Sequence, residues 1–159
     1  MTADVRAAVI VGCCNLIVDG DSFLLVREAK PSARRRYNLP AGKPEVGETL
    51  VEAAVREARE ETGLTIAVER LVGVYHCPET SEGFGVVNFV FASRVVGGDL
   101  RASVDHPEVR WFSRAEIVAL AADRLMRGMH IAAAINDYDR GASVPLETIR
   151  VVPASPLPE

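Results

Sequence analysis

The sequence predicts a single α+β domain in which a mixed β-sheet is flanked by helices. Apolar runs rich in β-branched residues recur along the chain, and helical stretches with capping signals interrupt them without regular βαβ alternation. The chain has 159 residues, of which 48% are hydrophobic and 25% are charged. This is the composition of one ordinary globular domain, so wholesale disorder and fibrous repeats are excluded.

The first strands are expected to form a hairpin. An apolar run covers residues 7–18, the pair Asp19-Gly20 follows, and a second apolar run covers residues 23–26. An Asp-Gly pair between two apolar runs is typical of a tight hairpin turn. We therefore expect a buried hairpin over residues 7–27, and further strands over residues 67–75, 86–96 and 109–112.

Three helices are expected, over residues 49–62, 114–122 and 125–138. The first two begin with Thr49-x-x-Glu52 and Ser113-x-x-Glu116, which match a capping box. Gly63 closes the first helix and Gly141 the last, as C-terminal caps. One domain is thus expected over residues 1–150, followed by a flexible C-terminal tail over the Pro-containing residues 151–159.

Charge and cysteine content limit the partners of the protein. With 18 Lys plus Arg against 22 Asp plus Glu, the net charge of -4 gives no general attraction for nucleic acid or an anionic membrane. The apolar run over residues 7–18 is too short to span a bilayer. The three cysteines have neither a disulfide framework nor zinc-ligand spacing, which favours a reducing compartment, and we expect a cytoplasmic protein.

The helix over residues 49–62 carries a cluster of acidic residues. At about 100° per residue, Glu57, Glu60 and Glu61 share one arc that is largely opposite an apolar stripe. That stripe consists of Val51, Ala54, Val55 and Ala58. Three carboxylates so close repel one another, and a hard divalent cation such as Mg²⁺ would supply the missing positive charge. The alternative is a solvated helix face with ion pairs between successive turns.

The wider spacing decides between these interpretations. From Gly42 the segment has five residues before Glu48 and seven more before the run Arg56-Glu57-Ala58-Arg59-Glu60-Glu61-Thr62-Gly63. This resembles the signature box of the Nudix hydrolases, which cleave a nucleoside diphosphate linked to another group. The resemblance implies the α/β/α sandwich of that family. It extends to the loop over residues 38–42 and the segment over residues 108–120, and residues 125–149 resemble the NudJ-type phosphatases.

The resemblance also implies roles for the box residues. Glu57, Glu60 and Glu61, with the backbone carbonyl of Ala41, are expected to bind Mg²⁺, for which Mn²⁺ can substitute. Glu48 would be an additional carboxylate near the metal, and Arg56 would orient the carboxylates.

Other candidates lie outside the box. Arg34, Arg35 and Arg36 form the only dense basic run in an acidic chain, and with Tyr37 they are expected to bind substrate, the alternative being a solvated loop. Phe84 is a further candidate, which could stack on a base. A carboxylate outside the box often completes such sites. The residues available are Asp105, His106 and Glu108, each interpreted as an ordinary loop residue, while Trp111 is expected in the core.

Together these features predict Mg²⁺-dependent hydrolysis of a phosphoanhydride bond in a nucleoside di- or triphosphate or a related pyrophosphate, with release of orthophosphate. The alternatives are hydrolysis of ADP-ribose, of a dinucleoside polyphosphate or of an oxidised nucleotide, and a nucleotide sensor without chemistry. The expected partner is a small nucleotide or pyrophosphate, not nucleic acid or a membrane, and a homodimer is the assembly considered. The base specificity is not fixed by the box, because loops build the base pocket.

Overall fold

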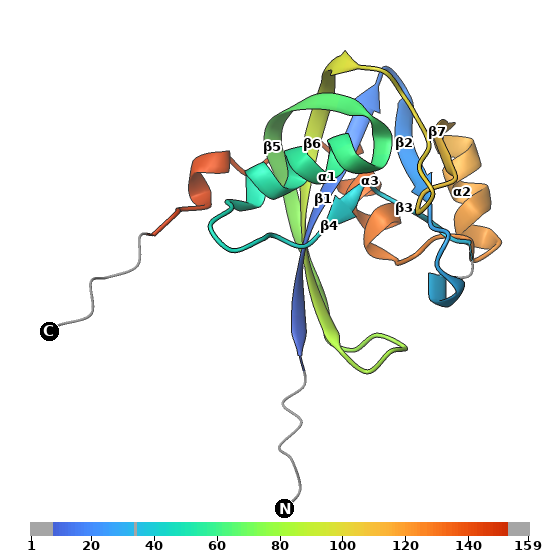
Figure 1. The fold of residues 1–159 in the computed structure, drawn as a ribbon, viewed down its shortest axis with the longest axis horizontal. Coiled ribbons are helices and arrows are strands. Elements are labelled where there is room, and N and C mark those ends of the chain that lie inside the picture. The colour runs from blue at the N-terminus through green and yellow to red at the C-terminus, as the bar shows by residue number, and fades with distance from the viewer. Residues whose placement is uncertain (1–7, 34, 153–159) are drawn as a thin grey trace, which may run out of the picture.

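The computed structural model describes residues 8–33 and 35–152, which form a mixed β-sheet with helices packed on both sides (Figure 1). The strands are β1 (Val9–Asp19), β2 (Ser22–Arg27), β3 (Tyr37–Asn38), β4 (Ala41–Gly42), β5 (Leu64–Cys77), β6 (Gly85–Gly98) and β7 (Glu108–Ser113). The α-helices are α1 (Leu50–Thr62), α2 (Arg114–Ala122) and α3 (His130–Asp139), and short 3₁₀ turns are η1 (Pro31–Ala33) and η2 (Leu146–Thr148).

The predicted N-terminal hairpin is confirmed. Strands β1 and β2 pair antiparallel, with Asp19 opposite Ser22 and a two-residue loop of Gly20 and Asp21 between them. Gly20 has φ +55°, a conformation that glycine adopts without a steric cost. The tight turn therefore lies one residue later than the Asp19-Gly20 pair of the prediction.

The sheet is mixed, as the sequence predicted. Its main order is β3-β2-β1-β6-β5, with β4 added to β1 and β7 added to β2. Strands β1 and β6 run parallel over residues 9–17 and 85–93, whereas the other named pairs are antiparallel. The sheet thus brings β4, which follows the loop at residue 40, directly onto the centre of β1.

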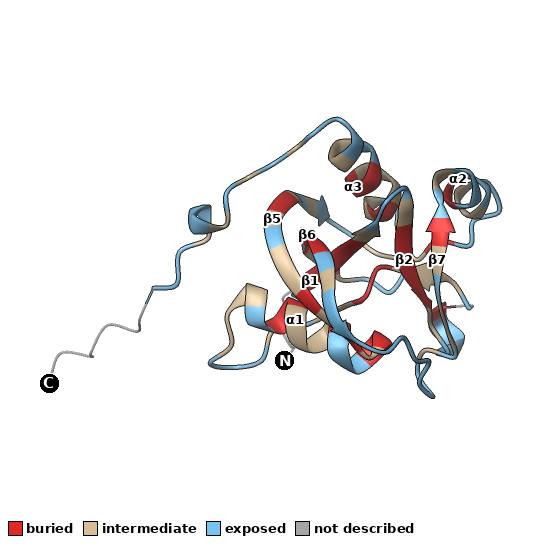
Figure 2. Ribbon diagram, turned by 90° about the horizontal axis from the view of Figure 1, so that it is seen from above, coloured by how far each residue is buried: buried red, intermediate tan, exposed pale blue. Residues whose placement is uncertain are grey.

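Strand β1 is buried on both faces, which explains its uninterrupted apolar run. Cys14 and Leu16 belong to the core cluster that contains the buried residues of α3. Cys13, on the opposite face of the strand, packs with Ala53 and Ala54 of α1. Figure 2 shows α1 and α3 on opposite sides of β1 and β6, so successive residues of β1 face different helices.

The predicted helix boundaries hold for α1 and α2. Thr49 and Ser113 each form both hydrogen bonds of a capping box, with Glu52 and Glu116 respectively. Gly63 ends α1 with φ +78°. The capping signals in the sequence therefore located these helix ends correctly.

The predicted start of the last helix at residue 125 is wrong, because α3 begins at His130. The backbone N–H of Tyr37 donates to the carbonyl of Leu125 at 2.7 Å, and the N–H of Arg127 donates to the carbonyl of Tyr37 at 2.7 Å. These bonds hold residues 125–127 beside β3 in an extended bridge. The first residues of the apolar segment are therefore not available for a helix.

Two further expectations concern the chain ends and the membrane. The tail predicted over residues 151–159 lies outside the described residues from residue 153 on, and Val151 and Val152 are exposed. Within the described part of the chain, no helix combines the length and the apolar character needed to cross a membrane.

Candidate active site

Arg56, midway along α1, contacts three carboxylates of the predicted box. Its Nε and Nη2 donate to the two oxygens of Glu48 at 2.8 and 3.0 Å. Its Nη1 donates to Glu57 Oε1 at 2.7 Å and to Glu60 Oε2 at 3.4 Å. The paired guanidinium holds the pKa of Glu48 below its usual range. These are the contacts that a residue orienting the acidic side chains requires.

Glu61 is buried, which differs from the predicted position opposite the apolar stripe. Glu61 follows Ala54 by seven residues, about two helical turns, so it lies at the edge of the apolar face and only 9% of it is exposed. The backbone N–H of Ala41 donates to its Oε2 at 3.0 Å. Burial raises the pKa of Glu61 to about 8, and the neighbouring charge of Glu57 acts in the same direction.

A polar cavity of about 200 Å³ opens beside Glu61. It is lined by Glu28, Lys30, Ala41, Glu61, Asp105 and His106. The Nε2 atom of His106 lies 3.3 Å from Glu61 Oε1, and burial lowers the pKa of this imidazole. Lys30 adds a positively charged side chain to the lining, so the cavity combines carboxylate oxygens with an ammonium group suited to an anionic ligand.

The loop before β7 carries Asp105 and His106 to this cavity, although the sequence interpretation treated both as ordinary loop residues. The N–H of Ala29 donates to the Asp105 carbonyl at 2.9 Å, and the His106 N–H donates to Ser103 Oγ at 3.0 Å. Because Glu108 of β7 pairs with Arg27 of β2, the residues just before β7 must lie beside those just after β2. Lys30 could not be predicted for the same reason, because no signal in the sequence indicates the pairing of β7 with β2 that brings it to the cavity.

Glu108, the third candidate outside the box, does not line the cavity. Its Oε1 accepts hydrogen bonds from the Tyr37 hydroxyl at 2.9 Å and from Arg110 Nε at 3.2 Å. The ring of Tyr37 also packs edge-on against Phe112, with ring centroids 4.9 Å apart. Tyr37 and Glu108 are therefore joined in a network between β3 and β7.

Of the other predicted substrate-binding residues, those that the structure describes are not among the residues that line the cavity. Arg34 lies outside the described residues. Arg35 is exposed with φ +56°, and the carbonyl of Arg36 accepts a hydrogen bond from the N–H of Glu28 at 3.1 Å. Phe84 is half-buried in the β5–β6 turn, where its carbonyl accepts a hydrogen bond from the N–H of Thr80 at 2.8 Å.

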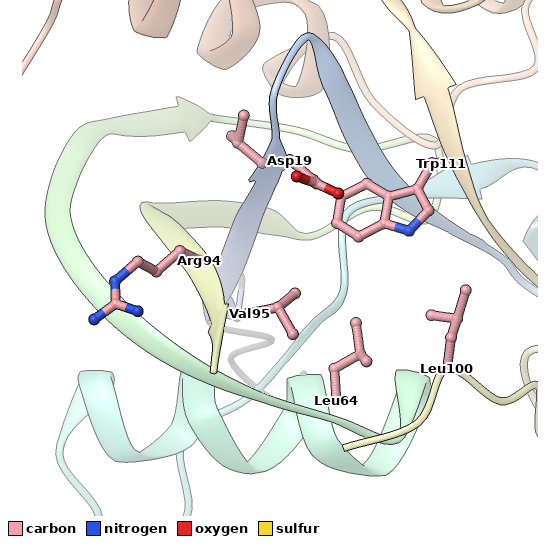
Figure 3. A pocket seen from close by; sticks show the side chains of 7 residues that line it. Asp19, Leu64, Arg94, Val95, Leu100 and Trp111 are labelled. Atoms are coloured by element: carbon pink, nitrogen blue, oxygen red, sulfur yellow. The ribbon is translucent and has the colours of Figure 1, made fainter. Parts of the chain in front are cut away.

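A second, larger cavity of about 350 Å³ lies elsewhere, at the end of α1 (Figure 3). The Trp111 ring forms one wall, with Leu64, Val95 and Leu100 nearby and the charged side chains of Asp19 and Arg94 at its edge. Trp111 also packs on a core cluster with Ile17 and Ala58, so its predicted core position holds in part. None of the predicted box carboxylates lines this cavity.

The acidic cluster is suited to a divalent cation by its chemistry, although it is not arranged around a common point. Over residues 8–33 and 35–152, no group of three or more His, Cys, Asp and Glu side chains is placed to hold a metal ion. Arg56 draws Glu57 and Glu60 towards itself, while Glu61 turns to the Ala41 N–H. The candidate glutamates Glu48, Glu57, Glu60 and Glu61 nevertheless offer hard oxygen donors, and they outnumber Arg56 and Arg59, the two arginines of the box, which fits a cation such as Mg²⁺.

Comparison with known proteins identifies the family. A model of the NUDIX domain matches residues 6–130 of the chain. The chain belongs to the Nudix hydrolase family. Members of this family generally use divalent metals, which agrees with the donor set of the acidic cluster. The segment that resembled the Nudix box is therefore part of a Nudix domain, and the predicted family is confirmed.

Several named relatives are similar in sequence. The phosphatase NudJ of Escherichia coli O1:K1 is 32% identical over 145 residues, which cover 89% of each chain. The ADP-ribose pyrophosphatase of Methanocaldococcus jannaschii is 37% identical over 68% of this chain and 64% of its own length. The human 8-oxo-dGDP phosphatase NUDT18 is 36% identical over 79% of this chain and 38% of its own length. The chain thus spans less than two thirds of the last two relatives.

The fold is also that of a solved Nudix structure. A NUDIX hydrolase from Nitrosomonas europaea superposes with a TM-score of 0.84 and 32% sequence identity, covering 91% of this chain and 98% of the other. The α+β architecture predicted from the sequence is therefore confirmed as the Nudix fold.

Proposed function

We propose that this Nudix protein hydrolyses a phosphoanhydride bond in a nucleoside di- or triphosphate, or in a related pyrophosphate, with Mg²⁺ as its cation and release of orthophosphate. The observation that carries the proposal is the buried carboxylate of Glu61 at a polar cavity that also contains Lys30. A buried carboxylate destabilises the fold unless a positive charge balances it, and the Ala41 N–H that donates to Glu61 carries no net charge. A divalent cation bound together with the substrate phosphate would supply that positive charge.

The position of each residue indicates its proposed role. Glu57, Glu60, Glu61 and the carbonyl of Ala41 would hold the cation, and Arg56 orients Glu57 and Glu60 from within the same helix. Glu48 occupies two donors of Arg56 and so fixes the plane of the guanidinium. Lys30 is placed to attract a phosphate group into the cavity. The bound cation would polarise the phosphate and lower the pKa of a water molecule.

The preference for orthophosphate release rests on the share of each relative's length that this chain matches. The match to NudJ extends over 89% of both chains, and the pattern of residues 125–149 resembles the NudJ-type phosphatases. The ADP-ribose and 8-oxo-dGDP alternatives rest on relatives of which the chain spans 64% and 38%. Both alternatives use the same acidic helix, because surrounding loops decide which phosphorus faces the attacking water.

The deciding experiment is a substrate screen with Mg²⁺ in which each product is resolved. ATP, ADP, 8-oxo-dGDP, a dinucleoside tetraphosphate and ADP-ribose are incubated separately, nucleotides are followed by chromatography, and orthophosphate is assayed in parallel. We expect ATP to give ADP and orthophosphate, and ADP to give AMP and orthophosphate. Fast release of AMP from ADP-ribose, with negligible orthophosphate from ATP or ADP, would replace this proposal by the ADP-ribose alternative.

A domain that only binds nucleotides would give a different result in the same screen. It would bind substrate with Mg²⁺ but yield no product from any of the compounds.

Replacing Mg²⁺ by Mn²⁺ should preserve turnover, since both cations accept oxygen ligands.

We further propose a homodimer in the cytoplasm that does not bind nucleic acid. The three free cysteines support a location in the cytoplasm, and the negative net charge supports the absence of nucleic-acid binding.

A further inference from the structure

Asn15 places a polar side chain in the middle of the most buried strand. It lies between Cys14 and Leu16 on β1, and none of its surface is exposed. A primary amide at such a position destabilises the fold unless its donors and acceptor are paired. The partners of this amide therefore indicate what the residue does.

Those partners come from three other segments. Asn15 Nδ2 donates to the Ala54 carbonyl of α1 at 2.7 Å and to the Pro40 carbonyl at 3.3 Å. The backbone N–H of Asn15 donates to the same Pro40 carbonyl at 2.8 Å, which extends the pairing of β1 with β4. On the other side, the Ser93 hydroxyl of β6 donates to Asn15 Oδ1 at 3.5 Å.

The Pro40 carbonyl and the Ala41 N–H belong to one planar peptide group. Asn15 holds the carbonyl end of this group with two donors. The N–H end donates to Glu61 Oε2 at 3.0 Å. Because the group is planar, fixing the direction of its carbonyl also fixes the direction in which its N–H points. Asn15 thus acts on Glu61 through a single peptide.

The same side-chain amide also fixes the helix that carries Glu61. Ala54 and Glu61 lie about two turns apart on one side of α1. By bonding to the carbonyls of both Pro40 and Ala54, Asn15 Nδ2 sets the distance between the peptide that donates to Glu61 and the helix that presents it. Among the residues that the structure describes, no other side chain donates to both the Pro40 carbonyl and a carbonyl of α1.

We infer that Asn15 is a positioning residue for Glu61, which orients the carboxylate from the opposite side of the Pro40–Ala41 peptide without touching substrate. Its catalytic consequence rests on the proposed function, because it assumes that Glu61 serves the hydrolytic site. The geometric part stands independently, since it concerns only the peptide and the carboxylate.

The test replaces Asn15 by Leu, which has the same branching and the same number of side-chain heavy atoms, keeps the backbone N–H and removes both side-chain donors. The control is Ile17→Val. Ile17 is buried on the same face of β1, and its apolar side chain forms no hydrogen bond with Pro40 or α1. Both proteins are compared with wild type at a temperature at which circular dichroism shows all three fully folded. If Asn15→Leu does not fold, Asn15→Ser, which cannot span both carbonyls, takes its place.

Two readouts are expected to change for Asn15→Leu and not for Ile17→Val. In the cation-free protein, hydrogen exchange of the Ala41 amide should become at least about tenfold faster, because its orientation towards Glu61 is lost. With substrate, kcat should fall at least about tenfold while KM stays within about twofold, and the Mg²⁺ concentration for half-maximal rate should rise. A purely structural role would change both variants alike.

Wild-type Ala41 exchange and wild-type kcat in the folded Asn15 variant would overturn the inference. An equal loss in Asn15→Leu and Ile17→Val would do the same. If wild-type protein hydrolyses none of the substrates, the proposed function fails. The exchange comparison then still decides whether Asn15 positions the peptide.

Discussion

Gly42 lies directly against the carboxylate of Glu57. A methyl group on Gly42 would fall 2.0 Å from both Cδ and Oε1 of Glu57, which is too close for non-bonded atoms. The φ angle of Gly42 is not among the positive values, so the backbone would accept a larger residue, but the Glu57 side chain would have to move to make room for it. The first glycine of the box thus provides the space in which Glu57 meets Arg56.

The first prediction is that Gly42→Ala displaces Glu57 and lowers turnover by at least about tenfold, because a misplaced carboxylate ligand weakens cation binding. Gly97→Ala is the matched control, since its methyl group would find its nearest neighbour, Thr65 Cβ, at 4.0 Å. Steady-state rates over a range of Mg²⁺ concentrations, with thermal unfolding of both variants, make the comparison. Equal rates for the two variants would contradict the assigned role of Gly42.

The second prediction concerns two carboxylates of different exposure. Glu60→Gln and Glu61→Gln should each lower turnover by at least about a hundredfold, because each loses a negative charge near the cation. The Glu60 side chain is 59% exposed, so its variant should unfold at the wild-type temperature. Burial raises the pKa of Glu61 to about 8, so without cation its carboxyl is mostly protonated at pH 7 and Gln replaces one neutral group by another. The cation-free Glu61→Gln variant should therefore unfold close to the wild-type temperature.

Thermal unfolding without cation and turnover with saturating Mg²⁺ check both halves of this prediction. Near-normal turnover in either folded variant would show that the cation site is wrongly assigned.

Local signals in the sequence predicted the elements whose ends depend on a few neighbouring residues. The capping boxes at Thr49 and Ser113 and the glycine at residue 63 act over single helical turns, so they could be located without the fold. The hairpin of β1 and β2 is equally local. The box predicted the family for a related reason, since its spacing reflects one helix and the loop before it.

Features that depend on contacts between distant segments could not be predicted. Strand β3 and the late start of α3 arise together, because Tyr37 bonds to residues 125 and 127. Asp105 and Lys30 meet at one cavity only through the pairing of β7 with β2. Asn15 appeared to be part of an apolar run, and only the fold shows that its amide faces Pro40 and Ala54.

The third prediction tests the basic run before β3. If these arginines bind substrate as proposed, replacing Arg34, Arg35 and Arg36 together by Ala should raise KM by at least about fivefold, because three positive charges proposed to attract phosphate are lost, while Mn²⁺ affinity stays within about twofold. Steady-state kinetics and Mn²⁺ titration measure the two effects.

The control for this prediction removes the same charge elsewhere. Arg94, Arg140 and Arg150 are exposed and do not line the cavity beside Glu61. If the triple Ala variant at these positions raises KM equally, the effect comes from net charge alone. Unchanged kinetics in the first variant would favour the solvated-loop interpretation.

His130 is the first residue of α3, and the pH dependence of stability should reflect its position. Burial, assisted by the nearby charge of Arg127, lowers its pKa from 6.5 to about 4. A positive charge at a helix N-terminus is also unfavourable. The folded protein therefore binds fewer protons than the unfolded chain between these two pKa values.

The last prediction follows from that difference. As the pH falls from 7 through 6.5 towards 4, the unfolded chain takes up the proton first, so the free energy of unfolding should decrease across this window by about 1 to 2 kcal/mol from this partly exposed side chain. Below about pH 4 His130 is protonated in both the folded and the unfolded state, so the stability that depends on its neutral form is fully lost. Burial also lowers the pKa of His106, so part of the slope should remain when His130 is replaced. Urea unfolding of wild type and His130→Asn at pH 7, 6 and 5 measures the effect. An identical slope in both proteins would show that His130 ionises freely in the fold.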